Sequence, residues 1–407
     1  MAPRVALPPA SPAARPSLRL LLPLLPPLLA AAAFPPLNTT TVARAEALVM
    51  AAFGLPAEGS YGAYCNPCAL GDAIGPLVRL PFHDAIGGGR PSGKGGANGC
   101  IDFSAPGNSG LQAAVGNLSA AFDAGGLGAL MSRADFFVLA GNVALRVAST
   151  LPKGRSPDGG LPVPAAPLLA PFRYGRKDDA SCDGVDAAFL PGPGLSYAQM
   201  AAVFCARVGM TPRQLVAIMG AHSLGRARAA ETNGYDGSWS GFSSSLSIAY
   251  YVQLAGVFWS NKDAPMPDSW LAAPPAPGPP TDAPLINLKS PDVELIISPS
   301  DNCPQFNELN FSQPTPAPQP GTACPVNAIN VEVVKSYIAN QTLCWCRIAP
   351  SLILFFRAPH FKSNRKPITP PPSYQHIHAG WEDFAGAWQV LTEWSYAEGS
   401  LRPPVEG

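Results

Sequence analysis

The stretch VRLPFHDAIGGG, residues 78–89, places the cation Arg79, the imidazole of His83 and the carboxylate of Asp84 within six residues, although the chain has only five histidines. Arg79 and His83 are four residues apart, so a helix would carry both on one face, one turn apart. A guanidinium beside an imidazole lowers the pKa of the ring and keeps it neutral near pH 7. A neutral imidazole next to a cation can act as a general base. The stretch therefore predicts a catalytic pair on a helix.

Helical patterning continues on both sides of this stretch. Apolar residues recur at helical spacing in residues 41–53, 131–148, 195–209, 211–227 and 381–394. Ser132 and Thr211 are suited to cap the helices that follow them, and Pro212 occupies the first helical position. No alternating pattern is long enough to predict a sheet. The sequence therefore predicts a mainly α fold.

Composition bounds the partners of the protein and the compartment it enters. Charged residues make up 13% of the 407 residues and balance to zero, so neither a nucleic-acid surface nor an acidic tail is expected. Arginines precede an apolar run, LLLPLLPPLLAAAAF, at residues 20–34. We interpret residues 1–33 as a secretory signal, with a chloroplast transit peptide as the alternative, and expect no stable membrane span.

Cysteine and proline usage add two further expectations. Nine cysteines suit an oxidising compartment, and we interpret seven as disulfide candidates: Cys65, Cys68, Cys100, Cys182, Cys205, Cys303 and Cys324. Proline-rich stretches interrupt the helical patterns and predict loops. Residues 344–378 match nothing around them, so we predict one domain over 34–398 with an insertion at 344–378, and expect a monomer.

Several motifs resemble one family in their order along the chain. VRLPFHDA (78–85) resembles the distal helix of the plant-type haem peroxidases, and LVAIMGAHSLGRA (215–227) resembles their proximal helix. Between them, GGANGC, NSGL, MSRADF and FRYGRKDD resemble further motifs of that superfamily. The resemblance implies haem b as cofactor, in a fold of about ten helices whose two halves enclose it.

The resemblance also assigns roles to individual positions. Arg79 and His83 match the distal Arg and His, and Phe82 stands where secreted members carry Phe. Asn108 matches the Asn that hydrogen-bonds the distal His, and His222 matches the axial ligand of the iron. Asp135 and Arg176 match a buried structural ion pair.

The proximal pocket resembles a different class from the distal one. DGSW and ISPSD resemble the intracellular class, in which Trp239 would stack beside the axial ligand and Asp301 would accept its N–H. The chain therefore looks like a hybrid of a secreted-type distal pocket and an intracellular-type proximal pocket.

Three departures from the family bear on the site. Pro81 lies between Arg79 and His83 and can kink their helix. The family's distal calcium site would use Asp84, but Asn98 and Cys100 replace two of its other ligands. A proximal cation site at Ser223 lacks its expected carboxylate and would be weak or empty.

The resemblance implies hydrogen-peroxide-dependent oxidation of a small organic reductant through an oxoferryl haem intermediate. Thr232 replaces the Arg that binds ascorbate in the intracellular class, so a phenolic or aromatic donor is expected. Two alternatives stay open: a non-catalytic secreted module for binding or adhesion, and a haem-free metal protein using His83 and Asp84.

Overall fold

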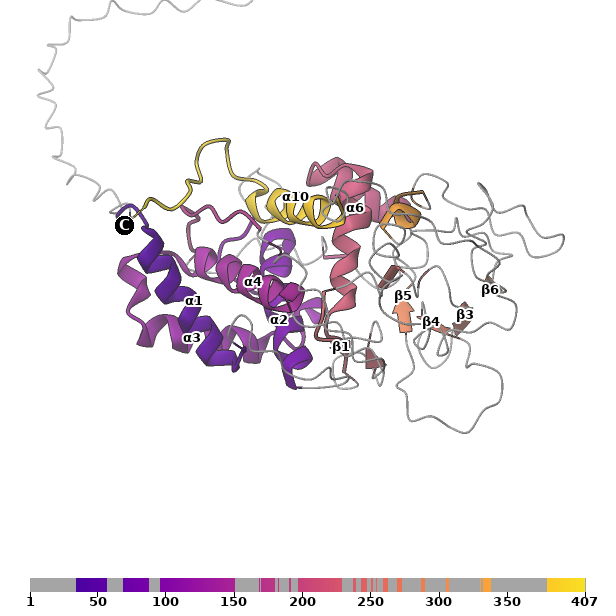
Figure 1. Ribbon diagram of the computed structural model, residues 1–407, viewed down its shortest axis with the longest axis horizontal. Coiled ribbons are helices and arrows are strands. Elements are labelled where there is room, and N and C mark those ends of the chain that lie inside the picture. The colour runs from indigo at the N-terminus through magenta and orange to yellow at the C-terminus, as the bar shows by residue number, and fades with distance from the viewer. Residues whose placement is uncertain are drawn as a thin grey trace, which may run out of the picture. The chain divides into compact units, whose positions relative to one another are not determined.

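The computed structural model describes residues 34–56, 69–87, 96–150, 170–179, 197–228 and 379–406, with shorter pieces at 168, 182, 190–191 and between 237 and 337 (Figure 1). Residues Pro35–Gly407 form one compact unit. The predicted leader at 1–33 and the predicted insertion at 344–378 lie outside the described residues, so both remain predictions.

Helices dominate the described part of the chain, as predicted. The α-helices are α1 (Thr39–Phe53), α2 (Ala69–Gly87), α3 (Gln112–Ala124), α4 (Arg133–Thr150), α5 (Tyr197–Ala201), α6 (Pro212–Met219) and α10 (Ala379–Glu393). Short 3₁₀ turns at Pro106–Asn108, Leu127–Ala129 and Gly220–Ser223 and a π-helical segment at Ala202–Arg207 complete the helical elements.

The predicted caps begin their helices. Thr211 accepts the backbone N–H of Gln214 at 3.2 Å, and Gln214 accepts the N–H of Thr211 in return, which forms a capping box at the start of α6. Ser132 accepts the N–H of Asp135 at 3.0 Å at the start of α4. These hydrogen bonds satisfy amides that a helix leaves unpaired at its first turn.

Short strands occur where the sequence predicted none. β1 (Arg226–Ala227) pairs antiparallel with β2 (Gly237–Ser238). A second sheet has the antiparallel order β5-β4-β3-β6, formed by Asn287–Lys289, Ser269–Ala272, Trp259–Lys262 and Gln305–Phe306. Strands of two to four residues are too short to show an alternating pattern in the sequence.

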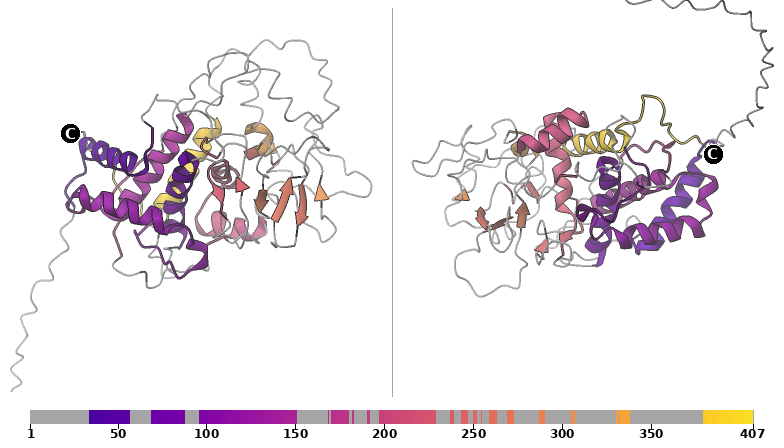
Figure 2. Two further views of the ribbon diagram at one scale, coloured as in Figure 1. Left: turned by 90° about the horizontal axis from the view of Figure 1, so that it is seen from below. Right: turned by 180° about the vertical axis from the view of Figure 1, so that it is seen from behind.

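The core lies where α2, α4 and α10 pack together, and α10 also covers α6 (Figures 1 and 2). Gly141 of α4 lies against both α2 and α10. A Cβ there would come 2.7 Å from Cγ of Pro81 and 2.8 Å from Cζ2 of Trp388. The indole N–H of the buried Trp388 donates to Asn142 at 2.7 Å. The final helix therefore has the packing role that its sequence predicts.

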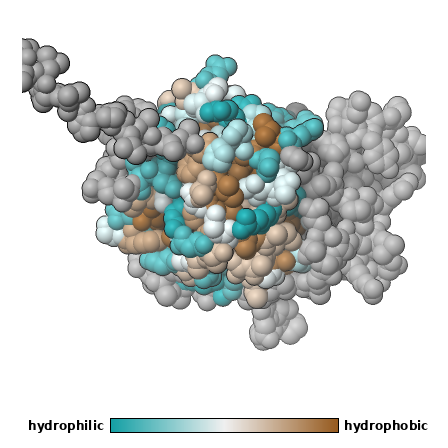
Figure 3. Space-filling model, turned by 90° about the vertical axis from the view of Figure 1, so that its left-hand side faces the viewer, coloured by the Kyte–Doolittle hydropathy of each residue, from teal (hydrophilic) through white to brown (hydrophobic). Residues whose placement is uncertain are grey.

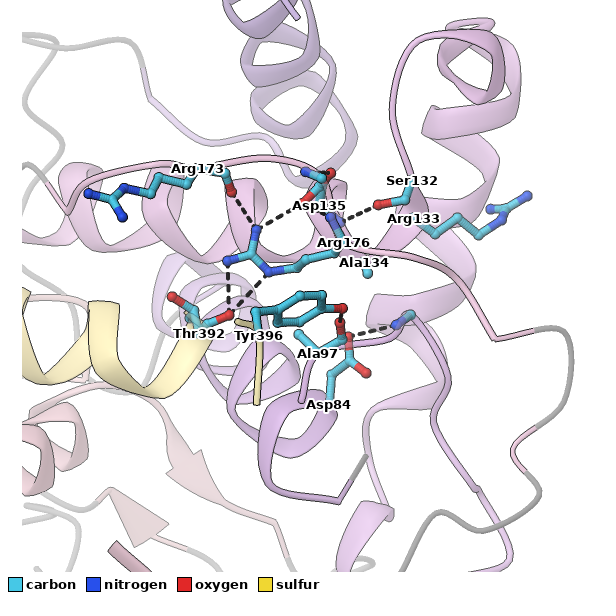
Figure 4. A network of polar contacts seen from close by, with 12 residues as sticks. Asp84, Ala97, Ser132, Arg133, Ala134, Asp135, Arg173, Arg176, Thr392 and Tyr396 are labelled. Atoms are coloured by element: carbon cyan, nitrogen blue, oxygen red, sulfur yellow. Dashed lines mark hydrogen bonds and ion pairs between the residues drawn. The ribbon is translucent and has the colours of Figure 1, made fainter. Parts of the chain in front are cut away.

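A buried ion pair ties the loop after α4 to this core. Arg176 and Asp135 meet at 2.8 Å with side chains 1% exposed, and Arg176 also donates to the carbonyl of Thr392 (Figure 4). A buried guanidinium needs such partners, because an unpaired charge in the interior is costly. The predicted structural pairing of Asp135 and Arg176 is confirmed.

The cysteines that the structure describes are of two kinds. Cys100 and Cys182 form a disulfide. Cys205 is free, so the prediction that it is part of the disulfide framework is wrong. Cys205 lies in the π-helical segment and is half-buried. The other four candidates, Cys65, Cys68, Cys303 and Cys324, lie outside the described residues.

Polar and apolar side chains are interspersed on the face shown in Figure 3. In the part of the chain that the structure describes, no helix is both long enough and apolar enough to cross a membrane.

Candidate active site

Arg79 and His83 meet on α2 as their spacing predicts. Nε of Arg79 donates to Nε2 of His83 at 3.0 Å. Because a guanidinium can only donate, Nε2 must carry the lone pair, and the ring proton must lie on Nδ1. Nδ1 then donates to Oδ1 of Asn108 at 2.8 Å. The contacts define the neutral tautomer of His83, with Nε2 as its basic atom.

The 3₁₀ turn at Pro106–Asn108, with the residue that follows it, contacts both His83 and Arg79. Asn108 is buried, and its Nδ2 donates to the carbonyl of Asp102 at 2.8 Å, which orients Oδ1 towards His83. The two terminal nitrogens of Arg79 donate to the carbonyls of Ser109 at 2.8 Å and Gly107 at 2.6 Å. One short turn therefore sets the orientation of the base and of its cation.

The surroundings keep His83 neutral. Desolvation of the ring, with the nearby charge of Arg79, lowers the pKa of His83 to about 3, against an opposing effect of the hydrogen bond to Asn108. A neutral imidazole can accept a proton throughout the physiological pH range.

Aromatic packing closes one side of this pair. Phe82 lies edge-on to the ring of His83, with 5.4 Å between ring centroids, and stacks on Phe204 at 6.0 Å. Phe204 belongs to the π-helical segment, a backbone form that occurs often at functional sites.

The axial-ligand candidate lies at the end of the other motif helix. α6 ends at Met219, and the 3₁₀ turn Gly220–Ser223 carries His222 beyond it. Tyr251 anchors this end because its hydroxyl donates to the carbonyls of Val216 at 2.8 Å and Ala217 at 3.0 Å. A Cβ at Gly220 would come 2.6 Å from that hydroxyl, so the glycine of the GAH motif allows the close approach.

The two motifs converge at a pair of glycines. A Cβ on Gly75 of α2 would come 2.9 Å from Cα of Gly225, three residues after His222. Arg79 and His83 follow Gly75 by one and two turns of the same helix. Asp72, just before the contact, pairs with Arg226 at 2.9 Å and with Arg228 at 3.3 Å. The helix with the candidate base is therefore fastened to the segment that follows the candidate ligand.

Sequence reasoning missed the residues that make this contact. Gly75, Gly225 and the ion pairs of Asp72 had no signal in their own stretches, because the partners are about 150 residues apart. The aromatic residue beside His222 was missed as well: Tyr250 lies edge-on to its ring, with 6.1 Å between centroids.

Two proximal predictions lie outside the described residues. Trp239 follows β2 directly in the sequence, and β1, the partner of β2, begins four residues after His222. The positions of Trp239 and Asp301 beside His222 both stay predictions.

The cation-site candidates lie in well-packed surroundings. Asp84 is fully buried, and its two oxygens accept the N–H groups of Asn98 at 3.0 Å and Gly99 at 2.9 Å. Ser223 is buried as well. Among the described residues, no three His, Cys, Asp or Glu side chains gather as a metal site. Calcium at Asp84 therefore stays a prediction that these contacts do not favour.

Comparison with known proteins agrees with this arrangement. Residues 60–254 match the model of the peroxidase family. Over 182 residues the chain is 32% identical to peroxisomal L-ascorbate peroxidase 5 of Arabidopsis thaliana. The aligned region covers 44% of this chain and 56% of the relative. Over 194 residues it is 28% identical to mitochondrial cytochrome c peroxidase of Neurospora crassa, covering 46% and 47%.

The matched segments carry the distal and proximal motifs together, on a mainly helical fold. This part of the chain is similar to the plant-type haem peroxidases. It spans about half the length of the curated relatives it matches.

The residues present fit a haem. The donor set contains one imidazole, His222, of the type that ligates haem iron, and a second imidazole that is held neutral beside a guanidinium. The glycine contact between Gly75 and Gly225 joins the elements that carry them. His222 would hold the iron, and Arg79 with His83 would supply a charge and a base for the bound peroxide.

Proposed function

We propose that the protein is a haem peroxidase that uses hydrogen peroxide to oxidise a small organic donor, with haem b as its cofactor. The observation that carries this proposal is the hydrogen-bonded series Arg79–His83–Asn108, which presents a neutral base with a defined tautomer beside a fixed cation. The proposal gives calcium no role.

The bound haem would supply the iron that receives peroxide and stores its two oxidising equivalents. His83 takes a proton from the inner peroxide oxygen at Nε2, after the N–H of Arg79 has moved off that atom. His83 then returns the proton to the outer oxygen, which leaves as water. Arg79 stabilises the negative charge that develops as the O–O bond breaks.

Asn108 acts through His83. Its side-chain oxygen accepts the Nδ1 proton and so keeps Nε2 free of hydrogen. Without this partner the ring could adopt the other tautomer, and the basic atom would point away from Arg79.

We also propose a phenolic or aromatic donor. Thr232, in place of the Arg that binds ascorbate in the intracellular class, supports this choice, although relatives are named for ascorbate and for cytochrome c. Steady-state assays that compare a methoxyphenol, ascorbate and reduced cytochrome c at equal concentration test the choice, which fails if the phenol is the poorest donor.

We further propose that the chain enters the secretory pathway, with chloroplast import as the alternative. The apolar run after the N-terminal arginines and the Cys100–Cys182 disulfide support this route. Determination of the N-terminus of the protein isolated from its natural source would test it.

The activity is tested by haem reconstitution followed by stopped-flow mixing with hydrogen peroxide. We expect a Soret band, and a His83→Ala variant that keeps the band but reacts with peroxide roughly 10²–10⁴ times more slowly. His222→Ala should lose normal haem retention. A chain that forms no Soret band would not be a haem peroxidase.

A further inference from the structure

Three tyrosines continue the line of aromatic rings that begins at His222. The ring of Tyr250 lies 6.1 Å from that of His222, Tyr251 lies 5.0 Å from Tyr250, and Tyr337 lies 5.2 Å from Tyr251, all between centroids. All three tyrosines are buried. These spacings are those of rings in contact, so no gap interrupts the series from His222 to Tyr337.

The far end of the series meets charged groups of two helices. The hydroxyl of Tyr337 donates to Oδ2 of Asp383 on α10 at 3.0 Å. The same carboxylate oxygen pairs with Nε of Arg213 on α6 at 2.6 Å. The guanidinium of Arg213 lies 5.2 Å from the ring centroid of Tyr337. The Arg213 side chain is 43% exposed, so the series ends near solvent.

The hydroxyl partners distinguish Tyr337 from Tyr251. A phenol that loses an electron becomes a strong acid, and its radical is stable only if the hydroxyl proton has a base to move to. Tyr251 donates to the carbonyls of Val216 and Ala217, which are not bases. Tyr337 donates to a carboxylate, which can take the proton. Tyr251 is therefore suited to pass an electron, and Tyr337 to give one up.

Arg213 strengthens this distinction. A cation over an aromatic face is attracted by the electron-rich ring, so it opposes a positive charge on that ring. Oxidation of Tyr337 is then favourable only if its hydroxyl proton moves to Asp383, so that the product is a neutral radical.

We propose that Tyr337 is a redox-active residue that stores one oxidising equivalent, with Tyr250 and Tyr251 as its path to the His222 side of the haem site. The inference rests on the proposed peroxidase function, whose oxidant is hydrogen peroxide. One electron leaves Tyr337 through Tyr251 and Tyr250, and its hydroxyl proton moves to Asp383. A phenolic donor near Arg213 returns the electron, and Asp383 returns the proton.

Electron paramagnetic resonance after rapid freezing tests the proposal. The haem-loaded protein is mixed with one equivalent of hydrogen peroxide and no donor. We expect a tyrosyl radical signal that narrows when the protein carries ring-deuterated tyrosine. Tyr337→Phe should remove most of this signal, while the absorbance change on peroxide addition persists. Asp383→Asn should reduce the signal severalfold, because the amide cannot take the proton.

Tyr197→Phe is the matched control, since the hydroxyl of Tyr197 contacts Asn330 and its ring is not part of the series. This variant should keep the full signal. The proposed role of Tyr337 would be overturned, without affecting the peroxidase function, by either of two results. One is an undiminished signal in Tyr337→Phe, and the other is a wild-type protein that consumes peroxide without any tyrosyl signal. A haem-loaded protein that does not react with peroxide would overturn the peroxidase function as well.

Discussion

Among single residues, Asn108 shows how one side chain sets the chemistry of another. Its amide nitrogen is held by the carbonyl of Asp102, so its oxygen can only accept from His83. The proton on Nδ1 then leaves Nε2 as the basic atom, next to Arg79. The contact at Nδ1 therefore decides that Nε2, on the other side of the ring, is the basic atom.

The lowered pKa of His83 predicts the pH dependence of the proposed reaction with peroxide. The base must be neutral, and its pKa is about 3 in the folded protein. We expect a rate that is flat from pH 8 to about 4 and falls as the pH approaches 3, measured by stopped-flow absorbance. A fall centred near 6.5, the value of an ordinary histidine, would contradict this assignment.

Arg79→Leu should move that fall to higher pH, because it removes the smaller of the two effects that lower the pKa of His83 and leaves only desolvation, the larger one. The same variant should react more slowly at every pH, since it lacks the charge that stabilises O–O cleavage. Arg133→Leu, a change at the start of α4 away from His83, is the control and should leave the profile unchanged.

The same pKa has a consequence for stability with a definite sign. Below pH 6.5 His83 is protonated in the unfolded chain, whereas in the folded protein it stays neutral down to about pH 3. The contribution of His83 to the free energy of unfolding therefore falls as the pH drops through this window.

Residue patterns predicted the distal pair but not its setting. Arg79 and His83 could be placed together because a helix repeats every 3.6 residues, and that spacing is visible in the sequence. Asn108 was placed by resemblance to a family. The ion pairs of Asp72 and the series of tyrosines could not be predicted, because their partners are brought together only by the tertiary fold.

Among the elements, α2 is the one whose sequence is most at odds with its structure. It contains Pro76 and Pro81, each of which removes a helical hydrogen bond, yet it runs from Ala69 to Gly87. Packing explains why the Arg79–His83 contact persists: Gly141 of α4 leaves room for the ring of Pro81. The sequence suggests that Pro81 can disturb the Arg79–His83 pair, because the fit between Pro81 and Gly141 is not visible in the sequence.

Gly141→Ala should therefore destabilise the protein. Its Cβ would lie within 3 Å of Pro81 and Trp388, and overpacking of this kind costs roughly 1–3 kcal/mol. Gly116→Ala in the exposed part of α3 is the matched control, because nothing lies within 4 Å of its Cβ, and it should gain about 0.5–1 kcal/mol. Urea unfolding of both variants measures the difference, and equal midpoints would contradict the packing at Gly141.

At the scale of the whole molecule, the disulfide closes a long loop. Cys100 lies shortly after the distal helix and Cys182 lies 82 residues further along the chain. The loop includes Asn108, α3, α4 and the Arg176 ion pair. A crosslink of this span removes many conformations from the unfolded chain.

Replacing both cysteines by alanine should lower the free energy of unfolding by roughly 2–4 kcal/mol. Cys205→Ala is the control and should change it much less, because Cys205 forms no disulfide. Denaturant unfolding without reductant measures both variants. The crosslink has no stabilising role if the double variant and the wild-type protein unfold at the same denaturant concentration.

The position of α10 in the chain also bears on synthesis. Trp388 and Thr392 complete contacts with Asn142 and Arg176, which leave the ribosome more than 200 residues earlier. At about 5–20 residues per second, that interval lasts roughly 10–50 s. During this time the apolar surface of α2 and α4 that Trp388 will cover is exposed on the nascent chain. We expect chaperones to bind this surface, and the site around His83 to become stable only after α10 has left the ribosome.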